Sequence, residues 1–207
     1  LLLLRSDCDP PPPGDPLALP DGTILGTSSL RRAAQALART PAIQIRALRG
    51  NVPTRIQKLR DGNFDAILLA AAGVSRLNLD LEGLLSFELP FELMLPAPGQ
   101  GALAIETRAG DSTSDGLSAL HDEAVHRCVK AERHLLSLLG GGCHRPLGCL
   151  ATADQHGVRL PAVLGAIDDE ATEATVARVG GAAADPETAA GVCFEALRLA
   201  LPEVVVS

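Results

Sequence analysis

The sequence predicts an α/β domain with a parallel or mixed sheet, followed by a small α+β domain with an antiparallel sheet. Residues 20–95 alternate short apolar runs with segments whose apolar residues recur at helical spacing, a pattern typical of parallel strands joined by covering helices. Residues 119–207 open with one long amphipathic segment, continue as strand-like runs and close with a second helical segment. With 46% apolar residues in 207, the chain can bury two cores.

The α/β part is expected to run strand, helix, strand, helix, strand. The apolar runs at 23–26 and 43–47 predict the first two strands, and the run at 66–70 predicts a third, buried strand. A short turn of helix through Gly73 to Arg76 follows. The helical stripes are Leu30, Ala33, Ala34, Leu37 and Ala38 in the first helix, and Val52, Ile56 and Leu59 in the second. In sheets of this kind, ligands bind at the carboxyl ends of the strands.

The second part begins after residues 96–101, whose prolines and glycines break the pattern, and a strand at 102–106. From Asp122 a long helix is expected, with Glu132 on its apolar stripe as a polar group whose hydrogen bonds are satisfied. Glycines from Gly140 end this helix. Strands are then expected at 149–153, 158–167 and 173–179, before a closing helix at 186–199. The two stripes are Val125, Cys128, Val129, Leu135, Leu136 and Leu139, then Ala189, Val192, Cys193, Ala196 and Leu199.

Positive charge is concentrated in one stretch of an acidic chain. The net charge is −7, yet Thr23 to Arg60 contains seven Arg, one Lys and no acidic residue. Two blocks, Thr27–Arg32 and Leu48–Arg55, each follow a predicted strand and open a predicted helix. Serine hydroxyls, guanidinium groups and helix N-termini at such junctions favour a carboxylate or phosphate. The alternative is that the arginines coat solvated helix faces; two successive blocks favour the anion site.

Composition argues against several other classes of protein. Four Phe with no Trp or Tyr, in an acidic chain, argue against nucleic-acid binding. Five scattered Cys without a CxxC pair support neither a zinc site nor a disulfide framework, so a reducing cytosol is expected. No run is long enough for a membrane span or a signal sequence. Because the first residue is not Met, we expect that the natural N-terminus is missing.

One cysteine stands in a different setting from the others. Cys143 follows three glycines in a predicted loop, where its sulfur would be open to a bulky partner. Cys128, Cys149 and Cys193 fall in apolar patterns and are expected to be inert core residues, while Cys8 lies in a proline-rich linker. The histidines show no metal-ligand spacing.

Taken together, these segments resemble the porphobilinogen deaminase (hydroxymethylbilane synthase) family from about Leu19 to Leu201. Six blocks occur in the family's order. They are Gly26–Arg32, Leu48–Arg55, Asp65–Ala70, Ala72–Gly73 with Arg76, Leu95–Gly101, and Gly141–Cys143 with Pro146.

The resemblance implies a transferase of tetrapyrrole and haem biosynthesis. It would join four porphobilinogens head to tail, with release of ammonia, on a dipyrromethane cofactor held by a thioether to Cys143. Porphobilinogen carries acetate and propionate arms, which the arginines would bind. The implied cofactor-binding residues are Cys143, Thr27, Ser28, Ser29, Arg31, Arg32, Arg49, Gly50, Asn51, Arg55, Arg76 and Gln100. No metal site is implied.

The resemblance also implies a domain plan and a missing part. Residues 1–19 would be a linker or a remnant of the crossing from domain 1, and 20–95 a domain 2 resembling periplasmic binding proteins. Residues 96–118 would return to domain 1, and 119–207 would form the cysteine-bearing domain 3. The family's N-terminal domain, with its catalytic Asp, has no counterpart here. We therefore assign no catalytic residue and expect these residues alone to be an inactive fragment.

The parent protein is expected to be a cytoplasmic monomer that binds neither nucleic acid nor membranes. The rival interpretation is a non-catalytic polycarboxylate-binding module of the periplasmic-binding-protein type, since the second domain alone would hold such a ligand without any chemistry.

Overall fold

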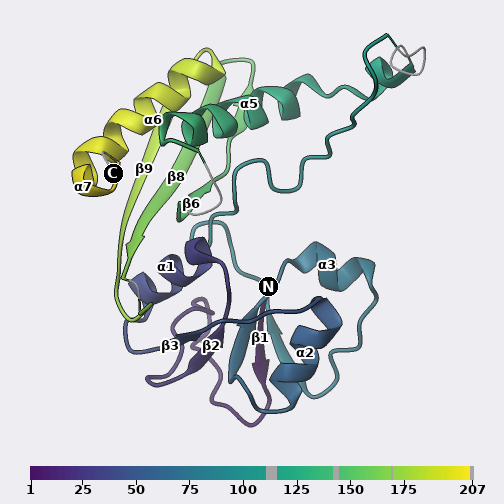
Figure 1. Ribbon diagram of the computed structural model, residues 1–207, viewed down its shortest axis with the longest axis vertical. Coiled ribbons are helices and arrows are strands. Elements are labelled where there is room, and N and C mark those ends of the chain that lie inside the picture. The colour runs from purple at the N-terminus through teal and green to yellow at the C-terminus, as the bar shows by residue number, and fades with distance from the viewer. Residues whose placement is uncertain (111–115, 142–144, 169, 206–207) are drawn as a thin grey trace. The chain divides into compact units, whose positions relative to one another are not determined.

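The structure of the chain, a computed structural model, describes residues 1–110, 116–141, 145–168 and 170–205. Contacts divide these residues into two compact units (Figure 1). Unit 1 consists mainly of Leu1–Met94 and the tip of a hairpin at Gly165–Val176. Unit 2 contains the remaining helices and most of a second sheet. Among the described helices, none has the length and apolar content needed to cross a membrane.

Unit 1 is built on a five-stranded mixed sheet in the order β3-β2-β4-β1-β5. β2 runs parallel to β3 and β4, whereas β1 is antiparallel to both β4 and β5. The register pairs Leu25 with Ala66 and Leu3 with Ile67. The strands are β1 (Leu2–Arg5), β2 (Ile24–Gly26), β3 (Gln44–Arg46), β4 (Ala66–Leu68) and β5 (Leu84–Phe87).

Helices cover both faces of this sheet (Figure 1). Helix α1 (Leu30–Arg39) packs its buried residues with Leu2 and Leu4 on one face. Helices α2 (Val52–Arg60) and α3 (Ala71–Arg76) pack with Leu3 on the other. Successive residues of a strand point to opposite faces, so the leucines of β1 serve both cores. The predicted α/β class with a parallel or mixed sheet is confirmed.

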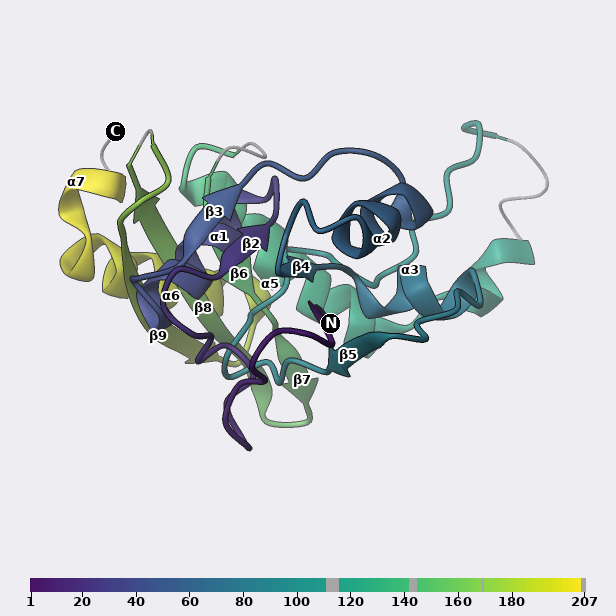
Figure 2. The same ribbon diagram turned by 90° about the horizontal axis from the view of Figure 1, so that it is seen from below.

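The first twenty residues belong to the fold more closely than the sequence suggested. A strand that the sequence did not predict lies in this stretch: Leu2, Leu3 and Leu4 are 0% exposed in β1, between β4 and β5 (Figure 2). The proline-rich stretch also docks on α1: the hydroxyl of Thr40 donates to the carbonyl of Leu17 (2.7 Å). An apolar run without alternation fits a strand that is buried on both faces.

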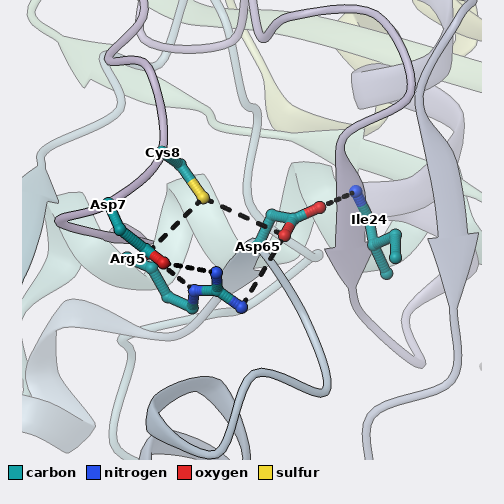
Figure 3. Close-up of polar contacts among 5 residues, drawn as sticks. All are labelled: Arg5, Asp7, Cys8, Ile24 and Asp65. Carbon is teal, nitrogen blue, oxygen red and sulfur yellow. Dashed lines mark hydrogen bonds and ion pairs between the residues drawn. The ribbon is translucent and has the colours of Figure 1, made fainter.

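A polar cluster joins three strands at the edge of the sheet where β2 and β4 begin, opposite the ends that lead into helices (Figure 3). One oxygen of the Asp65 carboxylate accepts from the backbone N of Ile24 (2.8 Å), and the other lies 4.0 Å from the Arg5 guanidinium. Arg5 also donates twice to Asp7, at 2.8 and 2.6 Å. Because Arg5 ends β1, Ile24 begins β2 and Asp65 precedes β4, these bonds fix the three strands together.

Unit 2 is an α+β arrangement with an antiparallel sheet. β6 and β7 both pair antiparallel with the long β8, and β9 pairs with β8 as well. Helices α5 and α6 pack on one side of this sheet, and their buried residues share its core (Figure 1). The elements are η1 (Ser118–Leu120), α5 (Glu123–Leu138), β6 (Leu147–Cys149), β7 (Thr152–Asp154), β8 (Gly157–Ile167), β9 (Ala174–Ala183), α6 (Pro186–Ala200) and α7 (Pro202–Val205).

Two details of the predicted second part are corrected. The strand expected at 102–106 does not form, and Leu103 and Ile105 are 85% and 59% exposed, because the described residues provide no neighbouring strand to pair with it. The predicted apolar stripes were also too wide: Val125, Val192 and Leu199 are exposed, since only the part of each helix that faces the sheet is covered.

Candidate anion-binding site

Three strands end at one edge of the first sheet, and a helix begins after each of them. β2, β3 and β4 are parallel, so their carboxyl ends lie on the same side; we call this side the carboxyl edge. α1 starts there with Ser29 as its N-cap, and α2 starts there with Asn51 as its N-cap. The first turns of these helices direct free N–H groups and partial positive charge outward. The predicted position of the two arginine-bearing blocks is therefore confirmed.

The loop after β2 is fixed by its own hydroxyl groups. Ser29 Oγ accepts from the backbone N of Arg32 (3.4 Å), and Thr27 Oγ1 accepts from the backbone N of Ser29 (3.2 Å). Ser28 Oγ donates to the carbonyl of Leu48 (2.9 Å), on the loop after β3. These bonds couple the start of α1 to the chain that leads into α2, so the two helix N-termini keep a fixed relation.

The loop after β3 depends on a glycine and an asparagine. Gly50 has a φ of 118°, and a Cβ there would lie 2.9 Å from the Thr54 methyl group. Asn51 Oδ1 accepts from both the backbone N (3.0 Å) and the hydroxyl (2.7 Å) of Thr54, which caps α2. Arg55 Nε donates to the carbonyl of Gly50 (2.7 Å), so this turn also fixes the Arg55 guanidinium.

Arg32 and Arg55 interact electrostatically at the carboxyl edge. Arg32 Nη1 donates to the carbonyl of Leu68, at the carboxyl end of β4 (2.9 Å). Burial, followed by the positive charge of Arg55, lowers the pKa of Arg32. No ion pair with a carboxylate involves either guanidinium within the described part of the chain. Two interacting cations without an acidic partner favour an anion with more than one negative group.

The other predicted arginines are less closely grouped. Arg31, in the first turn of α1, is buried with 9% exposure. Arg49 is exposed on the loop before α2, where its carbonyl accepts from Lys58 Nζ (3.0 Å). Arg76 is exposed in the last turn of α3.

The two remaining predicted residues lie outside unit 1 or outside the described residues. Gln100 is exposed in unit 2, and its backbone N donates to the carbonyl of Ala97 (3.0 Å). Cys143 lies outside the described residues, as do its neighbours Gly142 and His144.

The cysteines that the structure describes are poor nucleophiles. Cys149 and Cys193 are buried, which confirms the prediction of inert core residues. Burial raises the pKa of Cys193 to about 12, and it also raises the pKa values of Cys8 and Cys128. Because the thiolate is the reactive form, none of these three is primed for attack at neutral pH.

Sequence reasoning missed the backbone groups that hold the site. The carbonyls of Leu48 and Leu68 anchor Ser28 and Arg32, and a backbone carbonyl has no signature in the sequence. No cluster of three or more His, Cys, Asp or Glu side chains suited to a metal ion occurs among the residues whose structure is described.

Comparison with known proteins gives one consistent result. Residues 14–115 match the family model described as "Porphobilinogen deaminase, dipyromethane cofactor binding domain". Residues 126–197 match the model described as "Porphobilinogen deaminase, C-terminal domain". The two models together cover most of the chain, and each corresponds to one of the two sheets.

Curated relatives carry the same name. A porphobilinogen deaminase of Brevibacillus brevis is 51% identical over 152 residues, covering 72% of this chain and 48% of the relative. One of Nitrosomonas europaea is 52% identical over 134 residues, covering 64% and 43%. One of Listeria innocua is 43% identical over 175 residues, covering 81% and 57%. The chain thus spans about half the length of the curated relatives that it matches.

Proposed function

This chain belongs to the porphobilinogen deaminase family, and from that premise we propose that the protein containing it is a hydroxymethylbilane synthase. The reaction would be the head-to-tail condensation of four porphobilinogens with release of ammonia, on a dipyrromethane cofactor. The protein would be a cytoplasmic monomer of tetrapyrrole biosynthesis that binds neither nucleic acid nor membranes.

The observation that carries this proposal is the pair Arg32 and Arg55. Both guanidinium groups are fixed by backbone carbonyls, and the pKa of Arg32 is lowered first by burial and then by the charge of Arg55. A fixed guanidinium fork binds a carboxylate in two-point geometry. The acetate and propionate groups of porphobilinogen and of the growing chain supply such carboxylates, so the donors present fit both substrate and cofactor.

We assign two kinds of role at the carboxyl edge. Arg31, Arg32, Arg49, Arg55 and Arg76 would bind carboxylates. The groups that shape the two loops and leave backbone N–H groups facing the anion would be Thr27, Ser28, Ser29, Gly50 and Asn51. This refines the expectation that the hydroxyl groups contact the ligand themselves, since they are engaged with the backbone.

The cofactor would be attached through Cys143. When bound, a dipyrromethane supplies the pyrrole ring that is extended during the reaction. The raised pKa values of Cys8, Cys128 and Cys193 support Cys143 as the attachment point, because a thioether requires an accessible and reactive sulfur. Gln100 would line the crossing between domains.

The proposed domain plan remains 1–19 as a linker or crossing remnant, 20–95 as the carboxylate-binding domain, 96–118 as the return segment and 119–207 as the cysteine-bearing domain. None of the acidic residues is assigned as general acid. Asp65, just before β4, accepts from the backbone N of Ile24 and so lies at the edge opposite Arg32 and Arg55. The acid would therefore come from a part of the protein outside these residues.

The test is an assay of the full-length protein with porphobilinogen, which measures hydroxymethylbilane and ammonia together. The proposal expects about one ammonia for each porphobilinogen consumed. Binding of porphobilinogen without release of ammonia would instead support the rival function, a non-catalytic polycarboxylate-binding module.

A further inference from the structure

Glu132, on α5, is a buried carboxylate to which the proposed function gives no role. It is 5% exposed, in the core-facing part of the helix beside Ala131 and Leu135. Oε2 accepts from the backbone N of Gly99 (2.6 Å), and Oε1 accepts from the backbone N of Ala151 (2.7 Å). Each oxygen therefore holds a different segment: one holds the loop at 96–101, the other the chain just after β6.

No cation accompanies this carboxylate among the residues that the structure describes. Burial raises the pKa of Glu132, and its two backbone hydrogen bonds offset only part of that effect. An apolar side chain would fill such a position at lower cost in free energy. What a carboxylate adds is a pair of acceptors, set at the right separation to hold two backbone N–H groups.

The conformation of the loop at 96–101 depends on contacts with its neighbours. Gly99 and Gly101 have positive φ values of 69° and 94°, so the loop contains two residues with wide backbone freedom. A second contact fixes the start of the loop: the carbonyl of Pro96 accepts from the backbone N of Cys149 (2.9 Å). The close approach depends on Gly148, where a Cβ would lie 2.9 Å from the carbonyl oxygen of Leu95.

We propose that Glu132 is a positioning residue: its carboxylate fixes the 96–101 loop against α5 and β6, and thereby sets the place of Gln100 for turnover. Gly99, which Glu132 holds, directly precedes Gln100 in the chain. The link to turnover rests on the proposed function, whereas the link to the loop rests on the two hydrogen bonds alone.

The first measurement is amide hydrogen exchange in the full-length protein, resolved at Gly99 and Ala151. Glu132→Gln keeps the shape but replaces one acceptor oxygen with a donor, so at least one of the two amides should exchange about tenfold faster. Glu132→Ala should release both. Glu123→Gln is the matched control, because Glu123 is an exposed acid on the same helix; it should change neither amide.

The second measurement is steady-state kinetics with porphobilinogen. Glu132→Gln should lower kcat about tenfold or more and leave KM within about twofold, because the carboxyl edge still binds the substrate. Exchange that rises uniformly across unit 2, or amides at Gly99 and Ala151 that Glu132→Ala leaves unchanged, would overturn the proposal. An unchanged kcat would overturn it as well. A wild-type protein without turnover would refute the proposed function alone, since the exchange measurement needs no substrate.

Discussion

Arg32 and Arg55, on two different helices, interact electrostatically: burial lowers the pKa of Arg32, and the positive charge of Arg55 lowers it further. Both are held by carbonyls, Arg32 by that of Leu68 and Arg55 by that of Gly50. Like charges in a partly buried place repel each other unless an anion lies between them. The pair is thus preorganised for a ligand with several carboxylates, and ligand binding relieves the repulsion.

Removing one member of the pair should impair function without loss of stability. In the full-length protein, Arg32→Gln should lower kcat/KM for porphobilinogen about tenfold to a hundredfold. This factor corresponds to the loss of one charge-assisted hydrogen bond, ~1.5–3 kcal/mol. The thermal midpoint should not fall comparably, because the repulsion with Arg55 is also removed. Arg39→Gln, in the last turn of the same helix, is the control and should retain activity. Equal losses in both variants would contradict the assignment.

Two adjacent glycines of β9 should respond differently to alanine. A Cβ at Gly181 would collide with the carbonyl of Ala189 and lie 2.9 Å from the backbone N of Cys193, whereas a Cβ at Gly180 meets nothing within 4 Å. Gly181→Ala should therefore lower the free energy of unfolding by ~2 kcal/mol or more, because α6 must move away from the sheet. Gly180→Ala should change it by less than ~0.5 kcal/mol. Urea unfolding measures both, and a similar effect of the two substitutions would show that α6 does not pack here.

Glu132 should make stability depend on pH in a defined direction. Its pKa in the folded protein is raised above the ordinary value of 4.5. The stability that Glu132 contributes is therefore fully present below the ordinary pKa and is lost as the pH rises through the raised pKa. The unfolding free energy of the wild type should therefore fall relative to that of Glu132→Gln as the pH is raised from about 4.5 towards neutrality. A difference that moves the opposite way would show that the carboxylate is stabilised in its charged form.

The exposed segment at 102–106 should promote association of these 207 residues when they are purified alone. Leu103 and Ile105 are largely exposed and contribute to an open groove of about 930 Å³ in unit 2, together with Val125, Val129 and Leu136. Light scattering should show association at high micromolar concentration, and Leu103→Ser with Ile105→Ser should reduce it. Leu199→Ser, at an exposed leucine of α6, is the control. A chain that stays monomeric, or one that Leu199→Ser disperses equally well, would contradict this expectation.

Local patterns in the sequence predicted most of the fold, because periodicity reports which face of an element is buried. The helices at α1, α2 and α5 and the parallel strands followed from it. Strand β1 did not, since four successive leucines carry no alternation and its partners lie 62 to 85 residues away along the chain. The strand expected at 102–106 failed for the converse reason: its residues suit a strand, but strand formation needs a partner.

At the candidate site, topology explains what the sequence could and could not predict. Arginines placed just after parallel strands must lie near one sheet edge, so their common location was predictable. The electrostatic interaction of Arg32 with Arg55 and the buried state of Arg31 depend on side-chain rotamers and on backbone carbonyls of distant segments. The two hydrogen bonds of Glu132, to the backbone N of Gly99 and of Ala151, could not be predicted either. Its position on an apolar stripe did indicate a polar group with satisfied hydrogen bonds.

The most direct test of the account is the mass of the holo protein and of its proteolytic peptides. If the protein is a hydroxymethylbilane synthase, the intact full-length protein should be heavier by one dipyrromethane, and the added mass should lie on the peptide that contains Cys143. Cys143→Ser should lose that mass and the activity while the protein still folds, because the sequence predicts a glycine-rich loop there and loop residues contribute little to packing. An adduct on Cys128, Cys149 or Cys193, or an active protein without any adduct, would contradict the account.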